Sequence, residues 1–173
     1  MSDPPTTSTA PTGATREELT REAVRAWSDA DSLLFVCLGN VCRSPFAERL
    51  AVDRCGRRHV SSAGHYPVPG RRAPELALAT AQRFGVDLAS HRSRVLSRRM
   101  LEESDAVFVF DEENYEAVVS LHRGAAERTH LLATLSDEGA VRIKDPFGGP
   151  ASAYEVAYRR IAGAIAAAEQ ARQ

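Results

Sequence analysis

The sequence has few cysteines and aromatic residues, and it has no long apolar run. Its three cysteines show no C-x-x-C spacing, so the sequence supports neither a disulfide framework nor a zinc site. No stretch approaches the roughly 20 apolar residues that a membrane-spanning helix needs. The net charge of -1 gives no overall attraction to nucleic acid. These absences favour a protein without membrane insertion, nucleic-acid partner or bound metal, and the sparse cysteines suit the reducing cytoplasm.

The chain is long enough for one domain with a core of its own, because 173 residues with 43% apolar side chains are ordinary for a globular protein. Residues 1–15, rich in threonine and proline, predict a disordered tail. Thr15 and Glu18 form a capping-box pattern, and apolar residues recur at helical spacing as far as Trp27. We therefore expect a helix over 16–29, within an N-terminal extension of residues 16–30, and a main domain over 31–173.

Strand-like and helix-like segments alternate through the main domain. Four short apolar strands separated by helices predict an α/β fold, with a four-stranded parallel sheet covered by helices on both faces. Ligands of such sheets bind beyond the carboxyl ends of the strands. The expected strands are 32–37, 59–63, 106–110 and 129–132, and the expected helices are 44–55, 74–84 (beginning at Pro74), 97–104, 112–122 and 151–171.

The segment Cys37-Leu38-Gly39-Asn40-Val41-Cys42-Arg43-Ser44-Pro45 directly follows the first predicted strand. A loop between a strand and a helix turns successive backbone N–H groups inward, and together with the helix N-terminus they form an anion site. The positive field would favour the thiolate of Cys37, which could then attack phosphorus. The planar guanidinium of Arg43 would bind two phosphoryl oxygens at once. This spacing predicts phosphoryl transfer through a cysteine.

A cysteine nucleophile can displace a phosphate ester only if the departing oxygen receives a proton. The best candidate for the acid is Asp145, in the late loop Lys144-Asp145-Pro146-Phe147-Gly148-Gly149-Pro150. Pro146 favours an extended Asp145, and the glycines allow the backbone to approach a substrate. We therefore expect Cys37, Arg43 and Asp145 to be the catalytic residues.

From about residue 32 to the C-terminus, the chain resembles the low-molecular-weight protein tyrosine phosphatases, and it looks like a bacterial member. The phosphate loop at Cys37–Pro45 and the acid segment Asp145–Phe147 carry most of this resemblance. Three further segments support it, namely Val60–Gly64, Ser90–Arg94 and Phe110–Asn114. The resemblance implies a three-layer, flavodoxin-like fold for the phosphatase domain over 31–173.

The resemblance also implies a two-step hydrolysis without metal or cofactor. Cys37 would form a cysteinyl-phosphate while Asp145 acts first as acid and then as base, and Ser44 would donate a hydrogen bond to the thiolate. Asn40, Ser62 and His91 would support the loop, with Asn40 in a left-handed turn. The implied phosphate-binding residues are Leu38, Gly39, Asn40, Val41, Cys42, Arg43 and Ser44.

The chain departs from the family pattern at three positions near the expected site, one of them Gly148, which stands where animal members have a second aromatic residue. His65 stands where the family commonly has threonine, and Phe147 replaces a more frequent tyrosine. Phe147 can still line a slot for a flat ring, and Tyr66 is a candidate for the opposite wall. The expected partners are proteins or peptides that carry phosphotyrosine.

Three other functions compete with phosphotyrosine hydrolysis. Protein arginine phosphatases resemble this chain but carry threonine at the position of Val41, and the apolar Val41 favours tyrosine. Arsenate reductases of the same fold relay oxidation through a cysteine pair, which would lie near residues 100 to 115, where this chain has no cysteine. A binding module without turnover would need neither Cys37 nor Asp145.

Two further questions remain open from the sequence alone. Cys42 could capture an oxidised Cys37 as a disulfide, or it could simply pack beneath the loop. The helix over 16–29 could pack on its own domain, which we favour, or it could take part in dimerisation. We expect a monomer or a weak homodimer.

Overall fold

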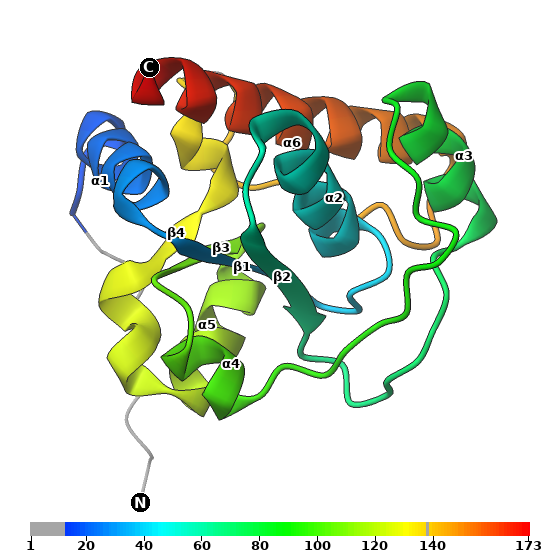
Figure 1. Cartoon of the computed structure of the whole chain (residues 1–173), viewed down its shortest axis with the longest axis horizontal. Helices are drawn as coiled ribbons and strands as arrows, with labels where there is room; N and C mark the ends of the chain where they lie inside the picture. Colours follow the sequence, from blue (N-terminus) through cyan, green and yellow to red (C-terminus); the bar gives the residue numbers. More distant parts are fainter. Residues whose placement is uncertain (1–12, 138) are drawn as a thin grey trace, which may run out of the picture.

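The computed structural model describes residues 13–137 and 139–173, and Figure 1 shows its central sheet between two layers of helices. The sheet is parallel, with the strand order β2-β1-β3-β4. Its strands are β1 (Ser32–Cys37), β2 (His59–Gly64), β3 (Ala106–Val109) and β4 (Thr129–Leu131). The predicted α/β fold with four parallel strands is therefore confirmed, and each strand end lies within one residue of its expected position.

The two central strands, β1 and β3, bury both of their faces, as expected for a parallel sheet with helices on each side. In β1, Phe35 faces one hydrophobic cluster while Leu34 and Val36 face the other, because successive side chains of a strand point to opposite faces. The same alternation separates Phe108 from Val107 in β3. The two clusters explain why β1 and β3 read as continuous apolar runs.

The helices divide between the two faces of the sheet (Figure 1). One layer holds α1 (Arg16–Asp29), α2 (Arg43–Cys55), α3 (Glu75–Arg83) and α6 (Ala151–Arg172). The other layer holds α4 (Arg98–Glu102), α5 (Glu112–Leu121) and the 3-10 helix η1 (Arg123–Arg128). A second 3-10 helix, η2 (Leu132–Leu135), follows β4 and packs against α1 and α6.

Helix α1 is an integral part of the first layer. Its predicted capping box is present, since Thr15 and Glu18 exchange side-chain-to-backbone hydrogen bonds. Trp27 is fully buried, and its Nε1 donates to a carboxylate oxygen of Glu169 in α6 at 2.7 Å. The Arg57 guanidinium lies 4.9 Å from the centre of the Trp27 ring and donates to the carbonyl of Trp27. The expectation that this helix packs on its own domain is thus confirmed.

Several local details differ from the sequence-based expectations. The two 3-10 helices were not predicted, because such short helices leave no clear hydrophobic period. Pro74 is the N-cap of α3 and not its first helical residue, and α4 is shorter than the expected helix over 97–104. Most of the predicted disordered tail, residues 1–12, lies outside the described residues.

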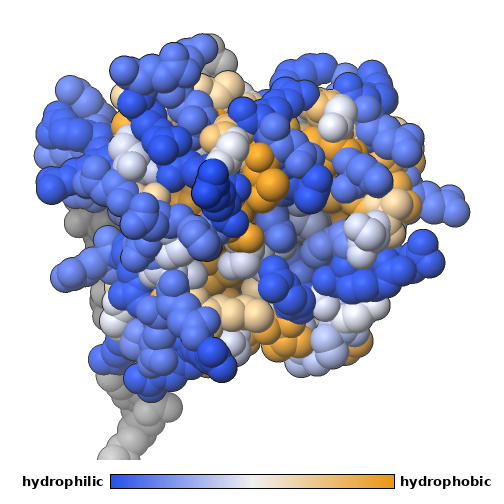
Figure 2. Space-filling model, in the orientation of Figure 1, coloured by the Kyte–Doolittle hydropathy of each residue, from blue (hydrophilic) through white to orange (hydrophobic). Residues whose placement is uncertain are grey.

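The surface in Figure 2 is mostly hydrophilic, with smaller apolar areas between the charged side chains. Within residues 13–137 and 139–173, no helix is long and apolar enough to cross a membrane.

Candidate active site

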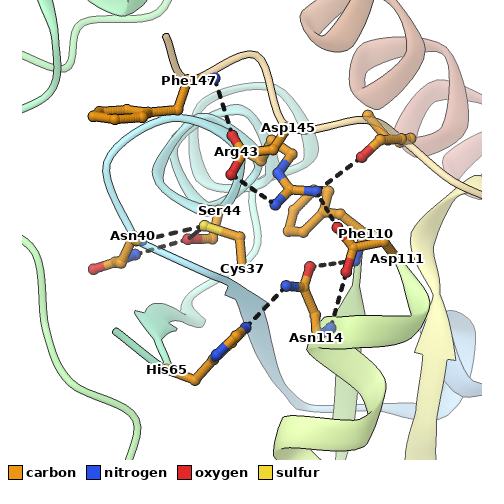
Figure 3. A network of polar contacts seen from close by, with 12 residues as sticks. Cys37, Asn40, Arg43, Ser44, His65, Phe110, Asp111, Asn114, Asp145 and Phe147 are labelled. Atoms are coloured by element: carbon orange, nitrogen blue, oxygen red, sulfur yellow. Dashed lines mark hydrogen bonds and ion pairs between the residues drawn. The ribbon is translucent and has the colours of Figure 1, made fainter. Parts of the chain in front are cut away.

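The loop between β1 and α2 curls around the sulfur of Cys37 (Figure 3). The backbone N–H of Asn40 donates to Sγ at 3.2 Å, and the Ser44 hydroxyl lies 3.0 Å from the same sulfur. Asn40 has a φ of 52°, the left-handed conformation expected for this turn. Because Asn40 Nδ2 donates to Ser44 Oγ at 2.8 Å, the hydroxyl hydrogen of Ser44 is available to Cys37. This arrangement can stabilise a thiolate.

The side chain of Asn40 links the loop to its surroundings. Its Oδ1 accepts a hydrogen bond from the backbone N–H of Arg94 at 2.8 Å, and its Nδ2 donates to Ser62 Oγ at 2.8 Å. Ser62 in turn donates to the carboxylate of Glu48 in α2. These bonds fix the amide orientation, and they lower the strain that a left-handed asparagine would otherwise carry.

His91 holds the loop from the other side. Its Nε2 lies 2.6 Å from the backbone carbonyl oxygen of Asn40, and since a carbonyl only accepts, Nε2 carries the proton. Burial lowers the pKa of His91, although the bond to the Asn40 carbonyl opposes this effect. The neutral ring therefore suffices for this contact. The structure thus brings Asn40, Ser62 and His91 together behind the loop.

Gly64 permits the close approach of β2 to the loop. A Cβ atom at this position would lie 2.6 Å from the carbonyl oxygen of Leu38 and 2.7 Å from the backbone nitrogen of Asn40. Neither neighbour is a flexible side chain, so any larger residue must displace the loop. The loop geometry consequently depends on a glycine here.

Arg43 opens α2 and is 1% exposed. Its NH1 donates to Asp111 Oδ2 at 2.7 Å and to the carbonyl oxygen of Ile143 at 2.8 Å, while its NH2 lies 3.3 Å from Asp145 Oδ2. Burial acts to lower the pKa of Arg43, but the negative charges of Cys37, Asp145 and Asp111 together raise it above the ordinary value. Arg43 is therefore a permanent cation at the site.

Asp145 enters the site from the loop between η2 and α6. Its Oδ1 accepts a hydrogen bond from the backbone N–H of Phe147 at 3.1 Å, a turn that orients the carboxyl. Figure 3 shows Asp145 beside the Arg43 guanidinium, with Cys37 below them. The structure thus brings together the three residues predicted to be catalytic.

A pocket of about 200 Å³ opens above the loop. Phe147 and Tyr66, the predicted walls, both line it, and the Arg71 guanidinium lies 4.5 Å from the centre of the Tyr66 ring. Arg71 also donates to the carbonyl oxygen of Gly39 at 2.7 Å. The lining residues are Cys37, Leu38, Gly39, Val41, Cys42, Tyr66, Arg71, Asp145 and Phe147. Asn40, Arg43, Ser44, Ser62 and His91 are not among them.

Cys42 is the N-cap of α2 and is 3% exposed. Burial, reinforced by the negative charges of Cys37 and Asp145, raises the pKa of the Cys42 thiol to about 12. The hydroxyl of Tyr158 in α6 donates to the carbonyl oxygen of Cys42 at 3.0 Å. Cys42 is thus a neutral, buried thiol at physiological pH, at the edge of the same pocket.

Comparison with known proteins identifies the family. The profile of the low molecular weight phosphotyrosine protein phosphatases matches residues 32–170. The chain belongs to this family. The profile covers the whole sheet, the cysteine loop and the acid loop of this phosphatase, and it begins after α1.

Relatives from bacteria agree with this assignment. The phosphatase is 31% identical over 128 residues to the probable low molecular weight protein-tyrosine-phosphatase AmsI of Erwinia amylovora. The aligned residues cover 74% of this chain and 88% of the relative. It is 30% identical over 128 residues to the protein-tyrosine-phosphatase Etp of Escherichia coli, over 74% of this chain and 85% of the relative.

Solved structures give the same fold. The crystal structure of AmsI aligns with a TM-score of 0.74 and 29% identity, over 83% of this chain and 91% of that chain. The arginine phosphatase YwlE of Geobacillus stearothermophilus aligns with a TM-score of 0.73 and 28% identity, over 80% of this chain and 90% of that chain. The fold alone therefore does not separate the two substrates.

The sequence reasoning missed several residues of the site of this phosphatase. Asp111 and Asn114 were noted only within the segment Phe110–Asn114 that supports the family resemblance, and Arg71 and Glu48 were not singled out. Asp111 is the N-cap of α5, a role that its place before a helix could have indicated. Its bond to Arg43, however, joins residues far apart in the chain. No local pattern predicts such a contact.

Proposed function

We propose that this chain hydrolyses phosphotyrosine in proteins or peptides through a cysteinyl-phosphate on Cys37. The observation that carries the proposal is that Cys37 and Asp145 line one pocket, with the buried Arg43 guanidinium 3.3 Å from Asp145 Oδ2 and Cys37 accepting a hydrogen bond from a loop amide. A thiolate nucleophile, a fixed cation and a carboxyl group are the three elements that the reaction requires.

In the first step, the phosphoryl group of the substrate enters the loop, and its oxygens replace Asp145 as the partner of Arg43. The added negative charge beside Asp145 favours the protonated carboxyl. The Cys37 thiolate attacks phosphorus while the bond from phosphorus to the tyrosine oxygen breaks. The departing oxygen takes the proton of Asp145, so that a neutral phenol leaves.

In the second step, Asp145 accepts a proton from water as the water oxygen attacks phosphorus. The bond between sulfur and phosphorus breaks, inorganic phosphate leaves, and the thiolate is restored. The Ser44 hydroxyl, 3.0 Å from the sulfur, stabilises the departing thiolate. Arg43 and the loop amides stabilise the negative charge of the phosphoryl group in both transition states.

The lining of the pocket favours an aromatic leaving group. Tyr66 and Phe147 provide apolar ring surface near the loop, and Val41 adds a branched apolar side chain. A phosphoarginine substrate would place a guanidinium against Val41 without a hydroxyl to bind it. These contacts support phosphotyrosine as the substrate.

Arginine dephosphorylation remains the second candidate, because arginine phosphatases are among the structural neighbours. The test is a comparison of kcat/KM on one peptide phosphorylated either on tyrosine or on arginine, with arsenate reduction measured in parallel. We expect a preference for phosphotyrosine of about a hundredfold. Val41→Thr should narrow this preference, whereas a faster reaction with phosphoarginine would overturn the assignment.

The remaining elements of the proposal concern the protein's setting. We place its substrates among cytoplasmic phosphoproteins, because three unpaired cysteines suit a reducing compartment. We further propose a monomer or a weak homodimer, since the apolar stripe of α1 is used within its own domain.

A further inference from the structure

His65 links the nucleophile loop to the turn that holds Arg43. It follows β2 directly, and its backbone N–H donates to the carbonyl oxygen of Cys37 at 3.2 Å. Its ring Nε2 lies 3.1 Å from Asn114 Nδ2 in α5 (Figure 3). His65 therefore contacts both the start of the cysteine loop and helix α5.

The surroundings of Asn114 decide the protonation state that this contact requires. Asn114 Oδ1 accepts a hydrogen bond from the backbone N–H of Phe110 at 3.3 Å, so the amide nitrogen faces His65. An amide nitrogen only donates, and His65 Nε2 must therefore accept with a free lone pair. Asn114 is 1% exposed, so little water can replace a lost partner. The contact exists only for a histidine that is unprotonated at Nε2.

The same turn carries the main partner of Arg43. The backbone N–H of Asn114 donates to Asp111 Oδ1 at 2.9 Å, and Asp111 Oδ2 accepts from Arg43 NH1 at 2.7 Å. A shift of Asn114 would therefore change the position of Asp111. Because Arg43 is buried and held by this carboxylate, its guanidinium would follow.

We propose that neutral His65 is a positioning residue for Arg43 and acts through Asn114 and Asp111. Protonation of His65 then weakens the binding of the phosphoryl group by Arg43. The proposal rests on the proposed phosphatase function. It gives this phosphatase a titratable group that acts on the phosphate site without contacting substrate.

The charges around His65 set the pH range of this effect. Burial lowers the pKa of His65, the carboxylates of Glu113 and Asp111 raise it, and the Arg43 cation lowers it, with a net lowering. The lowered pKa favours the neutral ring, which can accept from Asn114, at neutral pH. The contact is lost only as the pH falls through the lowered pKa, on the acid side of the usual histidine range.

The test compares His65→Gln and His65→Lys with the wild type. The oxygen of Gln can accept from Asn114 but does not titrate, whereas Lys places a permanent donor against a donor. His59→Gln is the matched control, because His59 is an exposed histidine at the start of the same strand. Two quantities are measured from pH 4.5 to 7.5, kcat/KM on one phosphotyrosine peptide and the Kd of inorganic phosphate by calorimetry.

We expect His65→Lys to lower kcat/KM at least about tenfold at pH 7, because small displacements of a positioning group have effects of this order. His65→Gln should restore most of this loss. The kcat/KM of His65→Gln divided by that of the wild type should rise several-fold from pH 7 to pH 5. The kcat/KM of His59→Gln should follow that of the wild type throughout. The second ionisation of the phosphate, near pH 6, affects all variants alike and cancels in the ratio.

Two results would overturn the proposal: an unchanged kcat/KM for folded His65→Lys, or a constant ratio of His65→Gln to wild type across the pH range. The phosphate Kd separates this inference from the proposed function. If the wild type fails to hydrolyse phosphotyrosine, the function is wrong, while the pH dependence of the phosphate Kd in His65→Gln still supports or contradicts the role of His65.

Discussion

The sharpest structural prediction concerns Trp27, which joins the N-terminal helix to the core of a domain whose family profile begins after that helix. The perturbation is Trp27→Ala. If α1 is an integral part of the fold, this substitution destabilises the whole domain and not only the helix. If α1 is an appendage, the domain unfolds at nearly the same denaturant concentration as before.

The magnitude follows from the contacts of the ring. Trp27 is fully buried, and its ring centre lies 5.6 Å from that of Phe108 and 6.3 Å from that of Phe35. Replacing a buried tryptophan by alanine typically costs about 3–5 kcal/mol. The substitution also removes the hydrogen bond to Glu169 and the ring beneath Arg57. We expect a loss of about 4 kcal/mol, which for a domain of this size lowers Tm by about 8–16 °C.

The assay is urea unfolding followed by far-ultraviolet circular dichroism, because Trp27 is the only tryptophan and its fluorescence disappears with the substitution. Trp27→Phe is the matched control, since it keeps an aromatic ring but loses the Nε1 donor. We expect this control to cost about 1–2 kcal/mol. A loss below about 1 kcal/mol for Trp27→Ala would refute the reasoning, because no fully buried tryptophan in a shared core is so dispensable.

Three further predictions concern the site. Asp145→Asn should reduce kcat strongly with phenyl phosphates but less with leaving groups that need no proton, and equal losses in rapid kinetics would remove Asp145 from the acid role. Peroxide treatment followed by mass spectrometry should reveal a Cys37–Cys42 disulfide. Its yield should increase with pH, because the raised pKa of Cys42 limits its thiolate, and finding only overoxidised Cys37 would reject this protection. Gly64→Ala should displace the loop at Leu38 and lower kcat/KM by about a hundredfold, whereas wild-type kinetics in the folded variant would contradict the contact distances.

The parts of the fold that were predictable are those with a strong local signal. Continuous apolar runs indicated the buried strands, and the capping box with its apolar stripe indicated α1. The 3-10 helices were missed because their hydrogen bonds span too few residues to produce a pattern. The strand order was likewise not predictable, since it depends on which crossover packs best and not on any single segment.

The candidate site divides in the same way. The cysteine loop is contiguous in sequence, so its residues could be assigned from their spacing and from the family resemblance. The contacts of Arg43 with Asp111 and of His65 with Asn114 join elements that only tertiary folding brings together. His65 was visible in the sequence only as a departure from the family pattern, without a role.

The central claim is that Cys37 carries the phosphoryl group during turnover. The most direct measurement is rapid acid quenching of the first turnover with a phosphotyrosine peptide that bears labelled phosphate, followed by proteolysis and mass spectrometry. The account predicts phosphate on Cys37 in the wild type and no hydrolysis by Cys37→Ser. Retained turnover in Cys37→Ser, or labelled phosphate on another residue of the wild type, would contradict it.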